Sequence, residues 1–270
     1  MNLQYIDIHS HLNLEPLKST EAEVVSRMVE HSVGTVTIGV DYETSKEAVA
    51  LAEKYDFVWA GIGMHPEDNK EEIFDYEVYK TLAENKKVVC IGECGLDYFR
   101  TKPEDKVATK ERQERIFKEH IKLSLESGKP LMIHARPSKG TMDAYQDVLD
   151  ILEGYKDGGD ASTLKGNFHF FVGDLEIAKR ALVIGFTMSF DGPITFSRDY
   201  DEVIKFLPLE SIMAETDSPF AAPVPHRGQK SEPYMVIEIV KKIAEIKGLS
   251  EEIVVKQLVF NSKRAFNLPN

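Results

Sequence analysis

The stretch YIDIHSHLN at residues 5–13 sets an acid and two histidines inside a strand-like alternation. Successive side chains of a strand point to opposite faces. Ile6 and Ile8 therefore lie on one face, and the other face carries Asp7, His9 and His11. A protein interior accepts such groups only when they pair with one another or bind something, most economically a cation. The stretch therefore predicts part of a metal site, and the rest of the chain must supply the missing ligands.

Length and composition favour one soluble domain. With 270 residues and 42% hydrophobic side chains the chain can bury a large core, and we expect a single domain over residues 1–270. No apolar run approaches the roughly 20 residues of a membrane span, and the N-terminus shows no basic leader with an apolar signal core. We therefore expect a cytoplasmic protein without a membrane partner, as a monomer or small oligomer. Cys90 and Cys94 are too few for a disulfide framework.

Strand-like and helix-like segments take turns along the chain, which is typical of βα units around a parallel sheet. The strand-like segments are residues 5–11, 35–39, 58–63, 88–93, 131–134, 166–170, 186–190 and 212–215. The helix-like segments are residues 19–31, with Thr20 and Glu23 at capping-box spacing, 44–55, 76–85, 110–127, 142–154, 174–184, 233–248 and 250–266, the last with Ser250 as its cap. Eight such pairs predict an α/β fold, a single (β/α)8 TIM barrel. The competing doubly wound open sheet lacks its glycine-rich phosphate fingerprint after the first strand.

Ligand-type residues recur where the predicted strands end. They are His9 and His11 on the first strand, His65 after the third, Glu93 at the end of the fourth with Asp97 in the loop beyond, His134 at the end of the fifth, His169 at the end of the sixth, and Asp217 after the eighth. In a TIM barrel these carboxyl ends converge on one rim, where the active sites of the fold lie. The pattern therefore brings these side chains together at the mouth of the barrel.

Each of these residues has an ordinary structural explanation when taken alone. A single buried histidine such as His134 or His169 can be a hydrogen-bonded core residue. Glu93 could cap a helix, and Asp217 could be the N-cap of the segment that follows it. Core histidines, however, have no reason to recur at the same end of three strands, with carboxylates at the same end of two others. The joint pattern predicts a metal site.

The same pattern predicts two divalent metal ions. Two histidines at i and i+2 on one strand face can chelate one ion, and a carboxylate can bridge two ions about 3.5–4 Å apart. Glu93 lies on the opposite wall from His9 and His11 and is the natural bridge, while Asp217 would reach the first ion and orient or deprotonate the attacking water. Histidine and carboxylate ligands suit Zn, Mn, Co or Fe, and Mg is a further candidate. The predicted chemistry is metal-assisted hydrolysis.

The ordered motifs DIHSHL, GMHP, GECGLDY, HAR, HFF, ETDSP and PHRGQKSEP resemble those of the TatD family of metal-dependent deoxyribonucleases, within the amidohydrolase-like barrels. The resemblance extends from residue 5 to the NSKRAF stretch near the end of the chain. It implies the metal ligands His9, His11, Glu93, His134, His169 and Asp217. It also implies that His65 and Arg136 neighbour the substrate phosphate and that Arg227 lies in the family's P-x-R-G loop. Departures from the family pattern, which bear on the substrate, occur at Pro137, Phe170, Val172 and Ser231.

The function favoured by the sequence is a deoxyribonuclease that cleaves DNA phosphodiester bonds through a metal-activated water, with single-stranded ends as its substrate. The formal net charge of −12 makes the surface as a whole repel nucleic acid, so local charge must hold the phosphates: the ions, His65, Arg136 and Arg227. The sequence shows no aromatic and basic stripe of the kind that single-strand binding platforms use.

Two other functions stay open. One is an amidohydrolase-type hydrolase of C–N, ester, lactone or phosphotriester bonds; such barrels often carry a carboxylated lysine as the bridge, and strand four has no lysine at its rim. The other is a metal-dependent binding protein without enzymatic activity.

Overall fold

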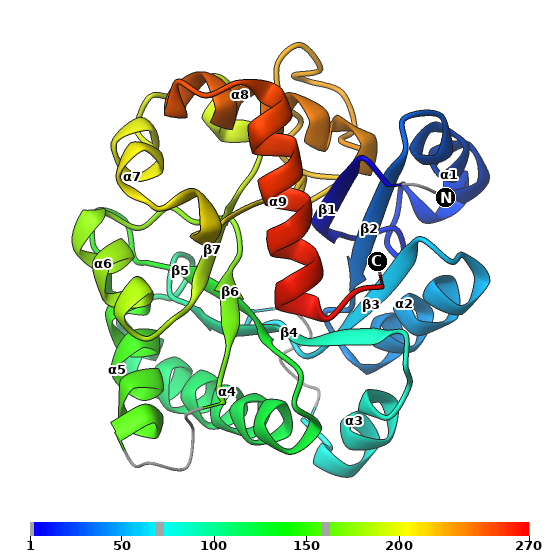
Figure 1. Cartoon of the computed structure of the whole chain (residues 1–270). Helices are drawn as coiled ribbons and strands as arrows, with labels where there is room; N and C mark the ends of the chain where they lie inside the picture. The colour runs from blue at the N-terminus through cyan, green and yellow to red at the C-terminus, as the bar shows by residue number, and fades with distance from the viewer. Residues whose placement is uncertain (1–2, 68–72, 158–162, 270) are drawn as a thin grey trace.

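The computed structural model describes residues 3–67, 73–157 and 163–269, and in these ranges eight parallel strands form one sheet whose order follows the chain (Figure 1). The strands are β1 Tyr5–Ser10, β2 Val33–Ile38, β3 Val58–Ile62, β4 Val88–Asp97, β5 Leu131–Arg136, β6 Gly166–Phe168, β7 Thr187–Phe190 and β8 Ile212–Ala214. The α-helices are α1 Glu21–Glu30, α2 Tyr42–Lys54, α3 Tyr76–Ala83, α4 Lys106–Ser127, α5 Asp143–Asp157, α6 Leu175–Val183, α7 Asp201–Phe206, α8 Val236–Lys247 and α9 Glu251–Phe266. The predicted TIM barrel is confirmed.

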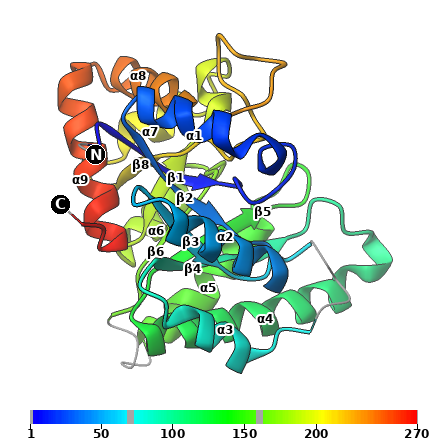
Figure 2. The same cartoon turned by 90° about the vertical axis from the view of Figure 1, so that its right-hand side faces the viewer.

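The two ends of the barrel differ. In Figure 2, α9 lies on the left and the strands point away from it toward the right, so α9 lies across the amino ends of the strands. Asn261 of α9 donates hydrogen bonds of 2.8 Å to the carbonyls of Leu209 and Ile212, where β8 begins. The connecting loops lie at the carboxyl ends of the strands, and the predicted site residues are at that end of the barrel. Within the described residues no helix is both long and apolar enough to span a membrane.

The core follows from the patterns of the segments. Strands such as β3, with the sequence VWAGI, are buried at every residue because helices cover the outer face and side chains fill the interior. Helix α8 buries a stripe at helical spacing, formed by Val236, Ile239, Val240 and Ile243.

Strand β4 is longer than predicted. It continues to Asp97, which was expected in the following loop, and Glu93 lies in its middle instead of at its end. The pairing with β5 shifts register between Ile91 and Cys94, so β4 bulges where it carries Glu93. Gly92 and Gly95 have φ of 147° and 138°, and a Cβ on either would overlap the backbone of β5. The two glycines of GECG thus allow the strand to turn its carboxylate into the barrel.

Local signals at the helix ends were predicted with mixed success. Ser250 caps α9 as expected, since its side chain accepts from the N–H of Ile253. The capping box at Thr20 is wrong, because the Thr20 hydroxyl donates to the carbonyls of Pro16 and Leu17 and leaves α1 without a side-chain cap. The short helix α7 between β7 and β8 was not predicted, since its six residues are too few to show a helical period.

Backbone and side-chain hydrogen bonds together close the barrel between β1 and the residues after β8, where the structure has an isolated bridge, Ser10 to Ser218. The carboxylate of Asp7 accepts from the Thr216 N–H at 3.0 Å, from the Thr216 hydroxyl at 2.7 Å and from the His9 N–H at 3.2 Å. Asp217 N donates to the His9 carbonyl at 3.0 Å. Asp7 therefore stabilises this junction between β1 and β8, the seam of the barrel. Its side chain is not one of those that face the metal ligands.

Replacing Asp7 should destabilise the fold. Asp7→Ala leaves two buried N–H groups and a hydroxyl without their acceptor, and we expect the free energy of unfolding to fall by about 2–4 kcal/mol. Burial raises the pKa of Asp7 well above its usual value although the Thr216 hydrogen bond opposes this, so the neutral Asp7→Asn is the matched control and should lose less. Urea unfolding followed by circular dichroism measures both variants. Equal stability of Asp7→Ala and the wild type would show that other contacts close the seam.

Candidate metal centre

The two histidines of β1 point their Nε2 atoms at one spot. These atoms lie 3.3 Å apart, and both rings are buried. The Nδ1 of His11 lies 3.0 Å from the carbonyl oxygen of Ile38, which requires a hydrogen on Nδ1 and makes Nε2 the nitrogen that can bind a cation once it has lost its own hydrogen. The i, i+2 spacing of the sequence therefore gives the predicted pair of convergent nitrogen donors.

Glu93 presents one carboxylate oxygen to each of two groups of histidines. Its Oε2 lies 3.5 Å from His9 Nε2 and 3.8 Å from His11 Nε2. Its Oε1 lies 2.8 Å from both His134 Nδ1 and His169 Nε2. A carboxylate in this position can bridge two cations. The explanation of Glu93 as a helix cap is wrong, because it lies inside a strand.

Asp217 joins the first group. Its Oδ1 lies 3.3 Å from His11 Nε2 and 3.7 Å from His9 Nε2. Its backbone is in the left-handed region, with φ of 50°, and its N–H bonds to β1 across the seam. The N-cap explanation is wrong as well, because no helix begins directly after Pro219 and the next helical turn is Pro233–Met235.

The donor set fits divalent metal ions. Among the described residues, three groups have ligand atoms within 4.8 Å of one another: His9, His11 and Glu93; His65, Glu93 and His134; and His9, His169 and Glu215. Imidazole nitrogens and carboxylate oxygens are the ligands of Zn, Mn, Fe and Co. A buried cluster of this kind is costly to leave without a cation.

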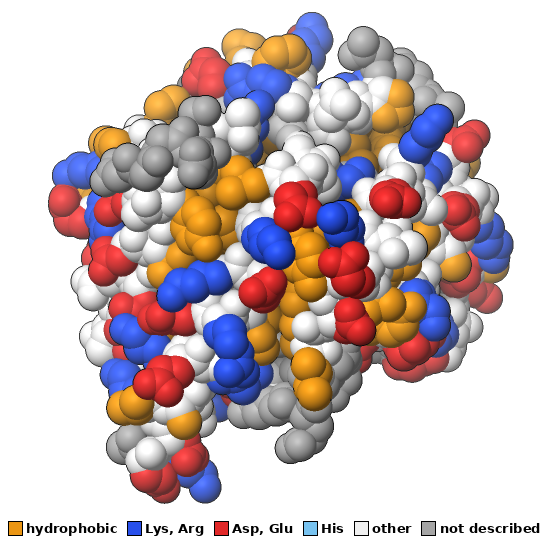
Figure 3. All heavy atoms as spheres, turned by 90° about the horizontal axis from the view of Figure 1, so that it is seen from below, with side chains coloured by type: hydrophobic (Ala, Val, Ile, Leu, Met, Phe, Trp, Pro, Cys, Tyr) orange, Lys and Arg blue, Asp and Glu red, His pale blue; other side chains and the backbone are white. Residues whose placement is uncertain are grey.

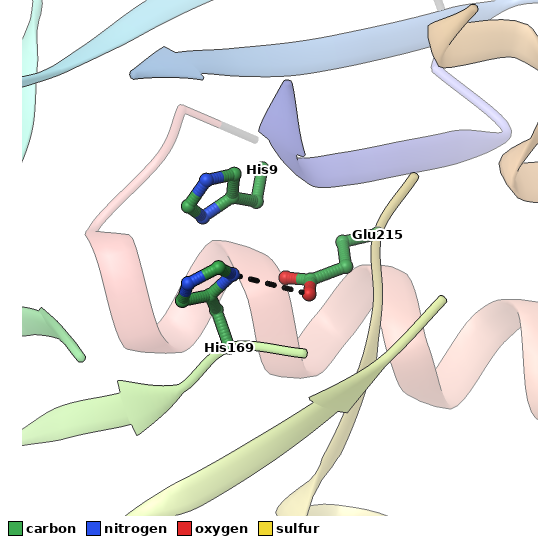
Figure 4. Close-up of side chains that lie close together, drawn as sticks. All are labelled: His9, His169 and Glu215. Atoms are coloured by element: carbon green, nitrogen blue, oxygen red, sulfur yellow. Dashed lines mark ion pairs between the residues drawn. The ribbon is translucent and has the colours of Figure 1, made fainter. Parts of the chain in front are cut away.

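Two further carboxylates contact His134 and His169, the histidines near Glu93 Oε1, at the ring nitrogens that point away from Glu93. Asp97 Oδ2 lies 3.0 Å from the Nε2 of His134, and its other oxygen accepts from the Phe99 N–H at 2.9 Å. Glu215 Oε1 lies 3.5 Å from the Nδ1 of His169, as Figure 4 shows, and Glu215 also accepts from the Ser189 hydroxyl at 2.7 Å. A carboxylate on the far nitrogen fixes the ring orientation and the tautomer of a ligating histidine.

The sequence left Asp97 and Glu215 without a role. For Asp97 the signal was present, since a carboxylate four residues beyond the predicted strand end is within reach of β5 once β4 continues to Asp97. Glu215 follows β8 directly, and no spacing rule points its side chain at His169.

The structure brings His65 closer to the ligands than its predicted contact with substrate requires. Its Nε2 lies 3.6 Å from Glu93 Oε1, and its ring packs edge-to-face on His134 with 4.4 Å between centroids. Burial lowers the pKa of His65 to about 4, so the ring is neutral near pH 7. A neutral imidazole is able to donate to a phosphate oxygen or to contribute a lone pair to a cation, and its role toward substrate stays a prediction.

The negative charge of Glu93 is held in place by its neighbours. Burial alone raises the pKa of a carboxyl group, but in the metal-free protein the charge of His169 and the hydrogen bonds from the protonated rings of His134 and His169 outweigh it. The pKa of Glu93 lies well below its usual value, so an ionised bridge is present before any cation binds.

The ligands open into a cavity of about 560 Å³. Its lining includes His11, His65, Glu93, His134, Asp217 and Arg136. The structure therefore brings Arg136 to the same cavity as the predicted ligands. Arg227 is not among the described residues of this lining; its guanidinium lies 3.7 Å over the ring of Phe196.

Comparison with known proteins identifies the family of the chain. The sequence model of the family described as TatD related DNase matches residues 6–267. The chain belongs to this family. It is 36% identical over 268 residues to the uncharacterized metal-dependent hydrolase YabD of Bacillus subtilis, covering 97% of this chain and 98% of the relative. It is 33% identical over 272 residues to the uncharacterized metal-dependent hydrolase YcfH of Escherichia coli K12, covering 97% and 96% of the two chains.

A solved structure gives the same fold. YJJV, a TatD homologue from Escherichia coli K12, superposes with a TM-score of 0.87 at 26% identity and covers 100% of both chains. This TatD-family chain is therefore a metal-dependent hydrolase on a TIM barrel, and the alternative of a binding protein without activity is set aside.

Asp97 offers a direct test of the outer carboxylates. An aspartate only accepts, which keeps the hydrogen on His134 Nε2 and the lone pair on Nδ1, whereas an asparagine can donate and favour the opposite tautomer. We expect Asp97→Asn to weaken divalent metal binding about 10- to 100-fold, measured by calorimetric titration of the metal-free protein.

The matched control is Asp147→Asn, because Asp147 pairs with Tyr98 and Lys110 and touches none of the histidines. Metal binding of Asp97→Asn at wild-type strength would mean that Asp97 does not orient His134.

Proposed function

We propose that this TatD-family hydrolase is a deoxyribonuclease with two divalent ions, held by His9, His11 and Asp217 on one side, by His134 and His169 on the other, and by Glu93 between them. The observation that carries the proposal is the division of the Glu93 oxygens between two groups of histidines, at the floor of a cavity that also contains Arg136. Two bound metal ions, next to a cavity that Arg136 helps to line, suit an in-line displacement at a phosphodiester.

When bound, the ions lower the pKa of a water molecule and polarise the phosphoryl oxygen. The residues of the chain supply the rest. Asp217 is anionic, because the hydrogen bond from His11 and the nearby imidazoles outweigh burial and hold its pKa below the usual value. It is the group that accepts the proton of the attacking water. Arg136 and His65 contact the non-bridging oxygens of the phosphate and hold the reacting group over Glu93.

The acidity of the chain is compatible with a DNA substrate of this kind. Figure 3 shows basic and acidic side chains intermixed around apolar patches on the face it presents, without a continuous basic track. With a formal net charge of −12, contact with DNA depends on the few cationic groups at the mouth. This arrangement suits the trimming of strand ends better than processive cleavage along a duplex.

A substrate panel tests the function. Single-stranded and duplex DNA, RNA, bis(4-nitrophenyl) phosphate, a phosphotriester, a lactone and an amide are assayed with Zn, Mn, Mg, Co or Fe added in turn to the metal-free protein. We expect release of mononucleotides from labelled single-stranded DNA, dependent on added metal. Turnover of the lactone, amide or phosphotriester without cleavage of DNA would replace this proposal with an amidohydrolase-type activity.

The bridging role of Glu93 predicts the metal stoichiometry. Glu93→Ala should lower bound metal from about two ions per chain to one or fewer and abolish hydrolysis, because two cations then repel each other without an anion between them. Elemental analysis after gel filtration measures the content, and circular dichroism checks the fold. Retention of both ions in Glu93→Ala would reject the bridge.

The proposed role of Asp217 predicts a selective loss of turnover. Asp217→Asn keeps the size and one coordinating oxygen but removes the oxygen that accepts the proton of the water. We expect kcat for DNA to fall about 100-fold or more at saturating metal, with most of the metal retained. Near-wild-type kcat at full metal content would mean that another group activates the water.

A further inference from the structure

Large aromatic side chains lie exposed at the mouth of the metal centre. Phe220 is 56% exposed and Phe99 is 46% exposed, whereas six of the fourteen phenylalanines, Phe117 and Phe168 among them, are buried in the core. Phe99 follows β4, which carries Glu93, and Phe220 follows Asp217 in the loop after β8. Single exposed rings are common on protein surfaces, so what distinguishes these two is their position beside the metal centre, where they offer a flat apolar face to a bound ligand.

Phe220 lies on the side of the first group of ligands. It lines the metal cavity, and its ring centroid is 6.2 Å from that of His11. Its N–H donates to the carbonyl of Asp217, which fixes the turn that presents the ring. A flat group entering the cavity beside His11 and Asp217 therefore meets an aromatic face.

Phe99 lies on the side of the second group. Its N–H donates to Asp97, the partner of His134, and the guanidinium of Arg136 lies 4.0 Å over its ring. Arg136 lines the metal cavity and also a neighbouring groove that Phe99 itself lines. The Arg136–Phe99 stack thus stands where the cavity passes into the groove.

Glu93 separates the two aromatic positions. Its Oε2 faces His11, on the side of Phe220, and its Oε1 faces His134, on the side of Phe99. A phosphate held over Glu93 would have one exposed aromatic group on each side. The cavity, at about 560 Å³, falls in the usual range of roughly 300–1,000 Å³ for small-molecule sites, so flanking groups of a chain must extend onto the rim.

The arginine keeps its charge available. In the described part of the chain no carboxylate forms an ion pair with Arg136, so the edge of its guanidinium can meet a phosphate while its outer face can stack on a flat ring. The same arrangement recurs with Arg227 over Phe196, in two loops joined by the hydrogen bond from Val224 N to Thr195 Oγ1 at 2.9 Å.

We propose that Phe220 and the Arg136–Phe99 stack are two base-stacking subsites on either side of the scissile phosphate, so that the substrate is a single-stranded polynucleotide with unpaired bases at the cut. This inference rests on the proposed deoxyribonuclease function and specifies the form of its substrate. Only an unpaired base offers a free face to such a ring, because the bases of a duplex already stack on one another. The sequence did not show this platform, since its residues come from separate loops of the barrel.

The experiment compares Phe99→Ala and Phe220→Ala with the wild type on three substrates: a single-stranded oligonucleotide, the same oligonucleotide with abasic sites on both sides of the cut, and a small dialkyl phosphate diester that carries no aromatic ring. The ratio of kcat/KM for the oligonucleotide to kcat/KM for the small diester should fall about 10-fold or more in each variant. The abasic oligonucleotide should react with the wild type and the variants at similar rates, because it has no base to stack. Metal content and circular dichroism verify that the centre and the fold persist.

The matched control is Phe260→Ala. Phe260 is 57% exposed and has Arg264 at 5.6 Å over its ring, but it lies on α9 at the opposite end of the barrel. For Phe260→Ala, the ratio of kcat/KM for the oligonucleotide to kcat/KM for the small diester should stay at the wild-type value. If the wild type cleaves the oligonucleotide and both mouth variants keep the wild-type ratio, the subsites are rejected and the deoxyribonuclease stands. If the wild type cleaves the small diester and no oligonucleotide, the deoxyribonuclease is rejected and the subsites with it.

Discussion

The buried charge of Glu93 is the constraint on which the rest of the structure depends. Its side chain is 5% exposed, and an ionised carboxylate in such a place is costly unless cationic or hydrogen-bonding groups surround it. The groups that do so come from β1, β5 and the end of β6, so these strands must finish at one level around the bulge of β4. Gly92 and Gly95 make that bulge sterically possible, and the pairing of β4 with β5 shifts register there.

The two sides of this carboxylate are supported differently. On the Oε1 side, Asp97 and Glu215 stand behind the histidines and increase the basicity of their ligating nitrogens. On the Oε2 side, His11 is oriented by a neutral backbone carbonyl, and Asp217 depends on the seam fastened by Asp7. In the proposed mechanism the Oε2 side also has a different task, because it contains Asp217, which would receive the proton of the water. The Oε1 side would then hold its cation firmly, and the Oε2 side would hold the other cation and position the water.

Much of the metal centre was predictable from the sequence, because a barrel brings the carboxyl ends of strands that are far apart in the chain to one rim. Histidines and carboxylates at strand ends had to meet once the barrel was inferred, and the structure brings together the six predicted ligands. Asp97 was misplaced because apolar periodicity ends at Glu93, while the strand itself is continued by backbone pairing with β5. Glu215 and Phe220 had no local signal, since their contacts depend on the conformation after β8. Arg227 was expected near the phosphate, but the described cavity does not include it.

The rings of His9 and His169 stack on each other, with 4.0 Å between centroids and 13° between planes. They belong to opposite sides of Glu93, so neither ring can turn without disturbing the other. An ion that fixes one of them removes rotational freedom from both, and the second ion then finds its ligand already ordered. In the proposed two-ion centre, uptake of the ions would therefore be positively cooperative, and by thermodynamic reciprocity the loss of either would loosen its neighbour. Such a centre would be either fully loaded or empty, which would tie catalytic competence to a threshold in metal supply.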